Sequence, residues 1–191
     1  MAFFNRVPDA DGLEYWIGRF KAGMTIDEIA ESFYAAGVYF SDQTGYTPDM
    51  TNRQFVIKVY DYVLGRPDVE TNDPQGGLAY WTGELDLYEQ TQGVQGQSRG
   101  ALVSTMLDSA HTFKGNPYGT GEGQWGQVPD LLDNKIEVAD SFAVDWGLNY
   151  NSPAESITRG MAIAAAITPE SIDAAIALIG IDPANIDLGG L

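Results

Sequence analysis

The sequence of 191 residues contains no cysteine and a single histidine, His111. The lack of cysteine excludes disulfide bonds, thiolate nucleophiles, cysteine-based zinc sites and iron–sulfur clusters. Basic side chains are also scarce, because 10 Lys and Arg stand against 27 Asp and Glu, for a net charge of −17. A nucleic-acid backbone requires clustered positive charge, so this composition argues against a nucleic-acid partner.

Long hydrophobic runs are missing as well. No stretch of roughly 18 apolar residues occurs, and residues 1–6 are too short and too polar for a signal peptide. We therefore expect no membrane insertion. The acidic, cysteine-free composition with 22 glycines favours a secreted protein or one at the bacterial cell surface, exported by a route without an N-terminal signal peptide. The alternative interpretation of the same composition is a cytosolic domain.

The residues that are present predict a folded, all-α protein. Hydrophobic residues make up 44% of the chain and aromatic residues 12%, which distinguishes it from an acidic disordered chain. Helix-capping signals followed by apolar residues at helical spacing recur, whereas alternating strand patterns are absent, so we expect about eight helices. Capping boxes begin at Thr25, Thr51 and Ser152, and Asp11 is the expected cap of the first helix.

Two apolar stripes are expected to be buried. The first lies on the helix that follows Asp11, and the second lies on a helix in the second half of the chain. The first stripe comprises Leu13, Trp16, Ile17 and Phe20, and the second comprises Leu132, Ile136, Ala139, Ala143 and Trp146.

A glycine-rich segment divides the chain. Residues 113–129 contain five glycines and two prolines and are expected to form a loop that no helix crosses. We therefore predict a duplicated helical region over 1–124 and a C-terminal helical segment over 125–191 that packs on it. Residues 185–191 have no helical period and are expected to be extended or frayed.

The first region contains an internal repeat, with copies at about 4–40 and 52–113. The pattern Gly-Leu-x-Tyr-Trp occurs at residues 12–16 and again at 77–81. It follows Arg-x-Pro-Asp at 6–9 in the first copy and Arg-Pro-Asp at 66–68 in the second. In both copies the glycine is expected to permit close approach of the preceding turn.

The combined motif, Arg-x-Pro-Asp-x-x-Gly-Leu-x-Tyr-Trp, resembles a bacterial family of domains of unknown function with phycobilisome-linker-like repeats. Residues 133–139 and 167–172 are similar to the usual continuation of that family. Members are modules of large secreted proteins of the RTX, S-layer-like and adhesin kinds. The resemblance implies a non-catalytic extracellular structural or adhesive module, not an enzyme. The implied partners are other domains of a larger secreted protein or a second copy of the chain.

Alternating oxygen-bearing side chains mark a candidate calcium site in the second copy. Asp68, Glu70, Asn72 and Asp73 lie in one loop between two expected helices, which is the ligand spacing of calcium-binding loops. Asp9 and Asp11 form a shorter counterpart in the first copy. The alternative interpretation is a solvated acidic loop whose aspartates cap the following helix.

Two aromatic residues of the glycine-rich loop, Tyr118 and Trp125, have no periodic reason to be buried. Exposed aromatic side chains on loops are frequent ligand contacts. They support an alternative function, a carbohydrate-binding or other ligand-recognition module with a glycan as its partner.

Overall fold

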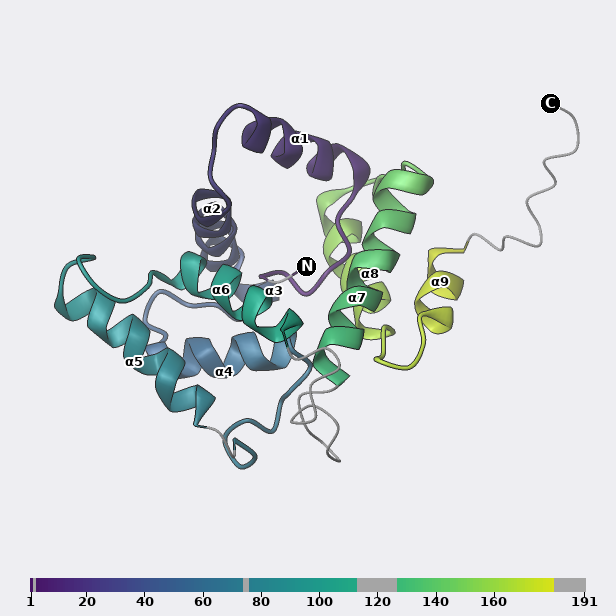
Figure 1. Cartoon of the computed structure of the whole chain (residues 1–191). Helices are drawn as coiled ribbons and strands as arrows, with labels where there is room; N and C mark the ends of the chain where they lie inside the picture. The colour runs from purple at the N-terminus through teal and green to yellow at the C-terminus, as the bar shows by residue number, and fades with distance from the viewer. Residues whose placement is uncertain (2, 74–75, 113–126, 181–191) are drawn as a thin grey trace, which may run out of the picture.

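The protein is described from a computed structural model, in which residues 1, 3–73, 76–112 and 127–180 are described. That part of the chain contains nine α-helices, one π-helical turn and no β-strand (Figure 1). The predicted all-α class is therefore confirmed. The α-helices are α1 (Ala10–Lys21), α2 (Ile26–Tyr39), α3 (Ser41–Thr44), α4 (Asn52–Tyr62), α5 (Gly77–Gln90), α6 (Arg99–His111), α7 (Gln127–Asp140), α8 (Pro153–Ala165) and α9 (Asp173–Ile179). The π-helical turn, η2 (Ser141–Asp145), continues α7.

Local side-chain caps set most helix starts as predicted. Thr25 and Thr51 form complete capping boxes, and the Ser152 hydroxyl accepts the Glu155 N–H at 3.1 Å. The first helix differs, because its cap is Asp9, whose Oδ1 accepts the Gly12 N–H at 2.7 Å. The backbone of Asp9 is extended and the helix begins at Ala10, so Asp11 lies in the first turn and cannot be the cap.

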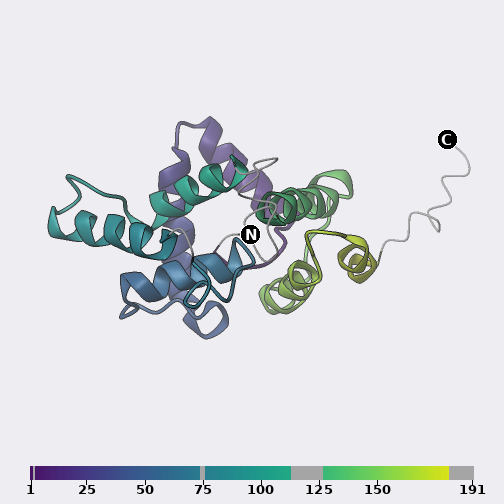
Figure 2. The same cartoon turned by 60° about the horizontal axis from the view of Figure 1, so that its bottom comes forward.

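The buried apolar residues form two clusters. The larger one joins the two repeats and is centred on α4, with Phe55, Val59 and Tyr60 fully buried. The smaller one lies among α7, α8 and α9. Figure 2 shows the helices of the repeats on one side and α8 and α9 on the other. Helix α7 links them, since Leu132 belongs to the first cluster and Leu131 to the second.

The N-terminal segment also reaches the second cluster. Val7 is fully buried there, its N–H donates to Gly160 O at 3.1 Å, and its carbonyl accepts the Tyr150 hydroxyl at 3.1 Å. Burial raises the pKa of Tyr150 to about 12. The start of the first repeat thus holds the C-terminal helices against the repeat region, and the two regions pack on each other.

Helix α7 departs from the prediction in two ways. It begins at Gln127, so residues 127–129 are helical although the glycine-rich loop was expected to reach 129. Pro129 is tolerated because first-turn N–H groups have no intrahelical partner. The predicted face was right at Leu132 and Ala143, which are buried, but wrong at Ile136, which is 52% exposed, and it left out Lys135 and Val138, which are buried. Because lysine is charged, Lys135 was not assigned to the buried face of the helix.

The two repeats pack through α2 and α6, which are the helices that follow the motif-bearing helices α1 and α5. Gly100 of α6 lies directly on the α2 backbone, where a Cβ would come within 2.5 Å of Glu31 N. The Gly100 N–H donates to Glu31 Oε1 at 2.9 Å. The copies therefore form one unit rather than two separate hairpins.

Candidate functional site

Helix α1 has no buried residue, although its sequence predicted a buried stripe. Leu13 and Trp16 are half-buried, but Ile17 is 42% and Phe20 53% exposed. The N-terminal end of α1 is held by the bond from Ala10 N to Leu148 O, 2.9 Å long, and further along the helix Trp16 packs on Phe33 at 4.7 Å between ring centroids. The helix spans the distance between α2 and the second half of the protein (Figure 1), so part of its apolar face remains uncovered.

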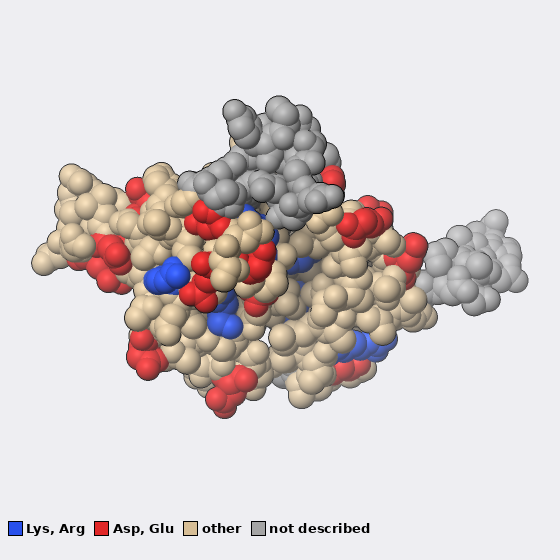
Figure 3. Space-filling model, turned by 90° about the horizontal axis from the view of Figure 1, so that it is seen from below, with Lys and Arg blue, Asp and Glu red and all other residues tan. Residues whose placement is uncertain are grey.

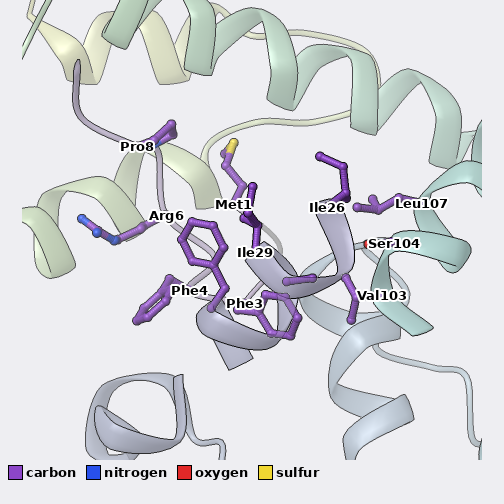
Figure 4. A pocket seen from close by; sticks show the side chains of 12 residues that line it. Met1, Phe3, Phe4, Arg6, Pro8, Ile26, Ile29, Val103, Ser104 and Leu107 are labelled. Carbon is purple, nitrogen blue, oxygen red and sulfur yellow. The ribbon is translucent and has the colours of Figure 1, made fainter. Parts of the chain in front are cut away.

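Two adjoining hollows, here called the central cleft, lie among α1, α2, α6, α7 and the N-terminal segment. They share Met1, Pro8 and Leu107. The smaller has a volume of about 220 Å³ and the larger about 420 Å³. Figure 4 shows the smaller hollow, with Ile26 and Leu107 beside each other at its edge.

The lining of the cleft is mostly apolar. The smaller hollow adds Phe3, Phe4, Ile26, Ile29, Phe33 and Val103. The larger hollow adds Leu13, Val63, Leu132, Ile136 and Ala139. Ligand sites are typically clefts of about 300–1,000 Å³ with apolar walls and a few placed polar groups. The larger hollow has these properties.

Lys135 is the buried charged group of the larger hollow. Its side chain comes from α7, the residue is 8% exposed, and Nζ donates to Tyr62 O at 2.7 Å and to Val63 O at 3.3 Å. These carbonyls lie at the C-terminal end of α4, where they lack intrahelical partners. Burial lowers the pKa of the Lys135 ammonium to about 8, opposed only by attraction to Asp61. None of the ion pairs between described residues includes Lys135.

Four further titratable side chains line the larger hollow: Tyr62 is half-buried, and Asp108, His111 and Asp140 are exposed. Met1 also lines it, and burial lowers the pKa of its α-amino group to about 5. His111 ends α6, and its Nδ1 is 3.8 Å from Asp133 Oδ1. The carboxylates therefore lie where water screens their charge, whereas the ammonium of Lys135 lies in the apolar interior.

The residues predicted to bind calcium in the second copy take part in protein contacts. Asp73 caps α5, with Oδ1 accepting the Gly77 N–H at 3.0 Å and Oδ2 the Leu78 N–H at 2.8 Å. The Asn72 amide donates to Asp68 Oδ2 at 2.8 Å, and Glu70 pairs with Arg53 at 3.1 Å.

The two aspartates predicted to bind calcium in the first copy also take part in protein contacts. Asp9 caps α1 and lies 3.9 Å from Arg6, and the Asp11 N–H donates to Asn149 Oδ1 at 2.9 Å. Asp9 and Asp73 thus have the same role, although Asp9 belongs to its Pro-Asp pair whereas four residues separate Asp73 from the second pair. Within the described ranges, no three acidic or histidine side chains are grouped so that they could hold a metal ion. Tyr118 and Trp125 lie outside the described residues.

Sequence reasoning missed two interior cations, the buried Lys135 and the half-buried Arg99. The guanidinium of Arg99 donates to Asn52 Oδ1 at 2.9 Å and Met50 O at 2.6 Å and lies 5.2 Å from the ring centroid of Phe55. It joins the start of α6 to the start of α4. For Lys135 the available signal was its position one helical turn from Leu131 and three residues before Val138.

We compared the chain with protein-family models, curated proteins and solved structures, and none of these comparisons found a match. The family resemblance of the repeat motif therefore stays a prediction. In the part of the chain that the structure describes, no helix combines the length and apolarity needed to cross a membrane.

Proposed function

We propose that the chain is a non-catalytic structural or adhesive module of a larger secreted bacterial protein, RTX-like or S-layer-like, and that calcium stabilises it. The observation that most directly supports this is the role of the repeated motif. In both copies its glycine, tyrosine and tryptophan take part in close packing along a helix, and in the first copy its aspartate also caps that helix, so the motif serves the construction of a rigid unit.

The two copies use the aromatic residues of the motif in the same way. In α1 and α5 the motif tyrosine and tryptophan form edge-to-face pairs, with ring centroids 5.1 Å apart in the first copy and 4.8 Å in the second. The caps differ, because Asp9 belongs to the motif whereas Asp73 lies outside it. Each motif glycine lies where a Cβ would collide, with Asp9 Oδ1 at Gly12 and with the Tyr60 hydroxyl at Gly77. In the first copy this is the expected close approach of the preceding turn, whereas in the second copy the close neighbour is Tyr60 of α4.

The calcium part of the proposal rests on charge. The 27 carboxylate side chains outnumber the 10 basic ones, so the charges of the chain repel each other on balance, and Figure 3 shows acidic side chains in several separate groups on one face. A cation that binds the folded chain more tightly than the unfolded chain would stabilise it. Extracellular modules typically bind calcium with dissociation constants of about 0.1–1 mM.

Thermal unfolding in millimolar calcium, against chelator and against sodium chloride of equal ionic strength, tests this part. We expect a higher melting temperature with calcium than with sodium. The variant Asp68→Asn with Glu70→Gln is expected to lose this difference, whereas Glu14→Gln with Glu137→Gln, which removes the same charge from exposed helix positions, is expected to retain it. Equal melting temperatures in calcium and sodium would eliminate calcium from the proposal.

Light scattering tests the structural part. A second copy is one of the expected partners, and calcium would screen the repulsion between two chains of charge −17. We expect the mean molar mass to rise with calcium. A chain that stays monomeric at all calcium and protein concentrations would contradict self-association and leave other domains as the proposed partner.

The central cleft supports a second candidate, a ligand-recognition module. Its apolar lining favours an apolar ligand over a glycan. The glycan alternative depends on Tyr118 and Trp125. It is tested by glycan-array binding of the chain and of Trp125→Ala, which should abolish any glycan signal.

A further inference from the structure

The larger hollow of the central cleft contains a buried positive charge without a carboxylate partner among the described residues. An ammonium group has three N–H donors, and two of those of Lys135 are directed to Tyr62 O and Val63 O. Burying an unpaired charge is costly. The carbonyl dipoles at the end of α4 offset part of that cost, and one donor remains.

The surroundings of this charge are apolar and extend well beyond it. Leu132, Ile136 and Ala139 lie around the larger hollow, and the shared residues Pro8 and Leu107 connect it with the smaller hollow. A ligand that matches both features has one anionic end and an apolar chain.

We propose that the central cleft binds an apolar monocarboxylate of the fatty-acid class, with its carboxylate on Lys135 Nζ and its chain along the apolar walls toward Ile26 and Phe33. This inference rests on the second candidate function, ligand recognition, and is independent of the structural role.

The acidic side chains that line the cleft do not make a cationic ligand the better match. Asp108 and Asp140 are exposed at its edge, where the interaction of two charges is weakened by water and salt. The ammonium of Lys135 is buried, so its attraction for an anion is much less screened. The net charge of −17 is expected to slow the approach of an anion and to make binding tighter as salt increases.

Isothermal titration calorimetry of the full chain with sodium decanoate tests the proposal. Decanol has the same chain without the charge, acetate has the carboxylate without the chain, and decyltrimethylammonium has the opposite charge. We expect decanoate to bind more tightly than decanol and decyltrimethylammonium, and acetate not to bind.

Three variants locate the site. Lys135→Met is expected to weaken decanoate binding about tenfold to hundredfold, the range for loss of a hydrogen bond to a charged group, and to leave decanol binding unchanged. Lys21→Met, which removes one positive charge from an exposed position of α1, is the matched control and should bind decanoate like the original chain. Ala139→Trp fills the larger hollow and should abolish binding of both ligands, with circular dichroism verifying the fold.

The outcomes separate the proposals. Equal binding of decanoate by the original chain and Lys135→Met, or tighter binding of decyltrimethylammonium, would overturn the carboxylate assignment while decanol binding would still support recognition in the cleft. Binding that survives Ala139→Trp would place the ligand elsewhere and overturn the site. If neither decanoate nor decanol binds, ligand recognition by the cleft is wrong, and the structural role is unaffected. Should Lys135→Met fail to fold, the decanoate-to-decanol ratio of the original chain and the Ala139→Trp result decide the matter.

Discussion

The crossing of α2 and α6 depends on the absence of a side chain at Gly100, and Gly100→Ala tests how strongly the two repeats are coupled. The added Cβ would lie 2.5 Å from Glu31 N and 2.8 Å from Ala30 C. Both atoms belong to the α2 backbone, so no side-chain rotation can make room. The two helices would have to separate along their shared interface, which includes the buried Leu102 and Val103.

The expected magnitude follows from two opposing effects. Overpacking of a well-packed interior costs about 1–3 kcal/mol. Alanine is a better helix former than glycine by about 0.8–1 kcal/mol. The net loss of free energy of unfolding should therefore be about 0–2 kcal/mol, which lowers the melting temperature of a domain of this size by up to about 8 °C.

Gly83→Ala is the matched control, because Gly83 lies in α5, is exposed and has no atom within 4 Å of the position of its Cβ. It should gain about 0.5–1 kcal/mol from helix propensity alone. Urea titration and calorimetric melting of both variants measure the difference. If Gly100→Ala is as stable as Gly83→Ala, the close approach of α2 and α6 is not a determinant of the fold.

Two further predictions concern charged side chains. Asp73→Ala removes the cap of α5 and is expected to cost about 1–2 kcal/mol in urea unfolding, against about 0.5 kcal/mol or less for the exposed Asp68→Ala; equal losses would contradict the cap. Burial lowers the pKa of Lys135 from 10.5 to about 8, so in that pH range the unfolded chain binds more protons and the free energy of unfolding rises with pH. Relative to Lys135→Met, it should rise by about 2 kcal/mol between about pH 7 and 9.5, and a difference independent of pH would refute the buried charge. Above about pH 10 the free energy of unfolding of both chains should fall with pH, because burial raises the pKa of Tyr46 and the unfolded chain loses that proton first.

The features predicted correctly from the sequence are those that depend on near neighbours. Thr25 and Thr51 cap their helices through the residue three positions on, and this geometry is the same in any fold. The periodicity around Trp16 likewise predicted a helix. It did not predict that Ile17 and Phe20 of that helix would remain exposed, because coverage depends on where α6 and α7 run.

The candidate site shows the same division. The alternating oxygens of the loop around Asp73 fit a calcium loop and a helix cap equally well, and the positions of the α5 N–H groups decided that Asp73 is a cap. Lys135 was not expected to be buried, since lysine is almost never buried without a partner. Its burial follows from the last carbonyls of α4, which belong to a residue pair more than 70 positions earlier in the chain.

The sequence by itself determined that the chain is helical, that it contains a duplicated motif and that its surface is strongly acidic. Composition, caps and periodicity act over a few residues, so they need no knowledge of the remote chain. Only the tertiary structure decided that α2 packs on α6, that Val7 ties the N-terminal segment to the C-terminal helices, and that a buried ammonium faces an apolar cleft beneath α1. Each of these brings together residues that are distant in sequence, and their proximity is a property of how whole helices pack.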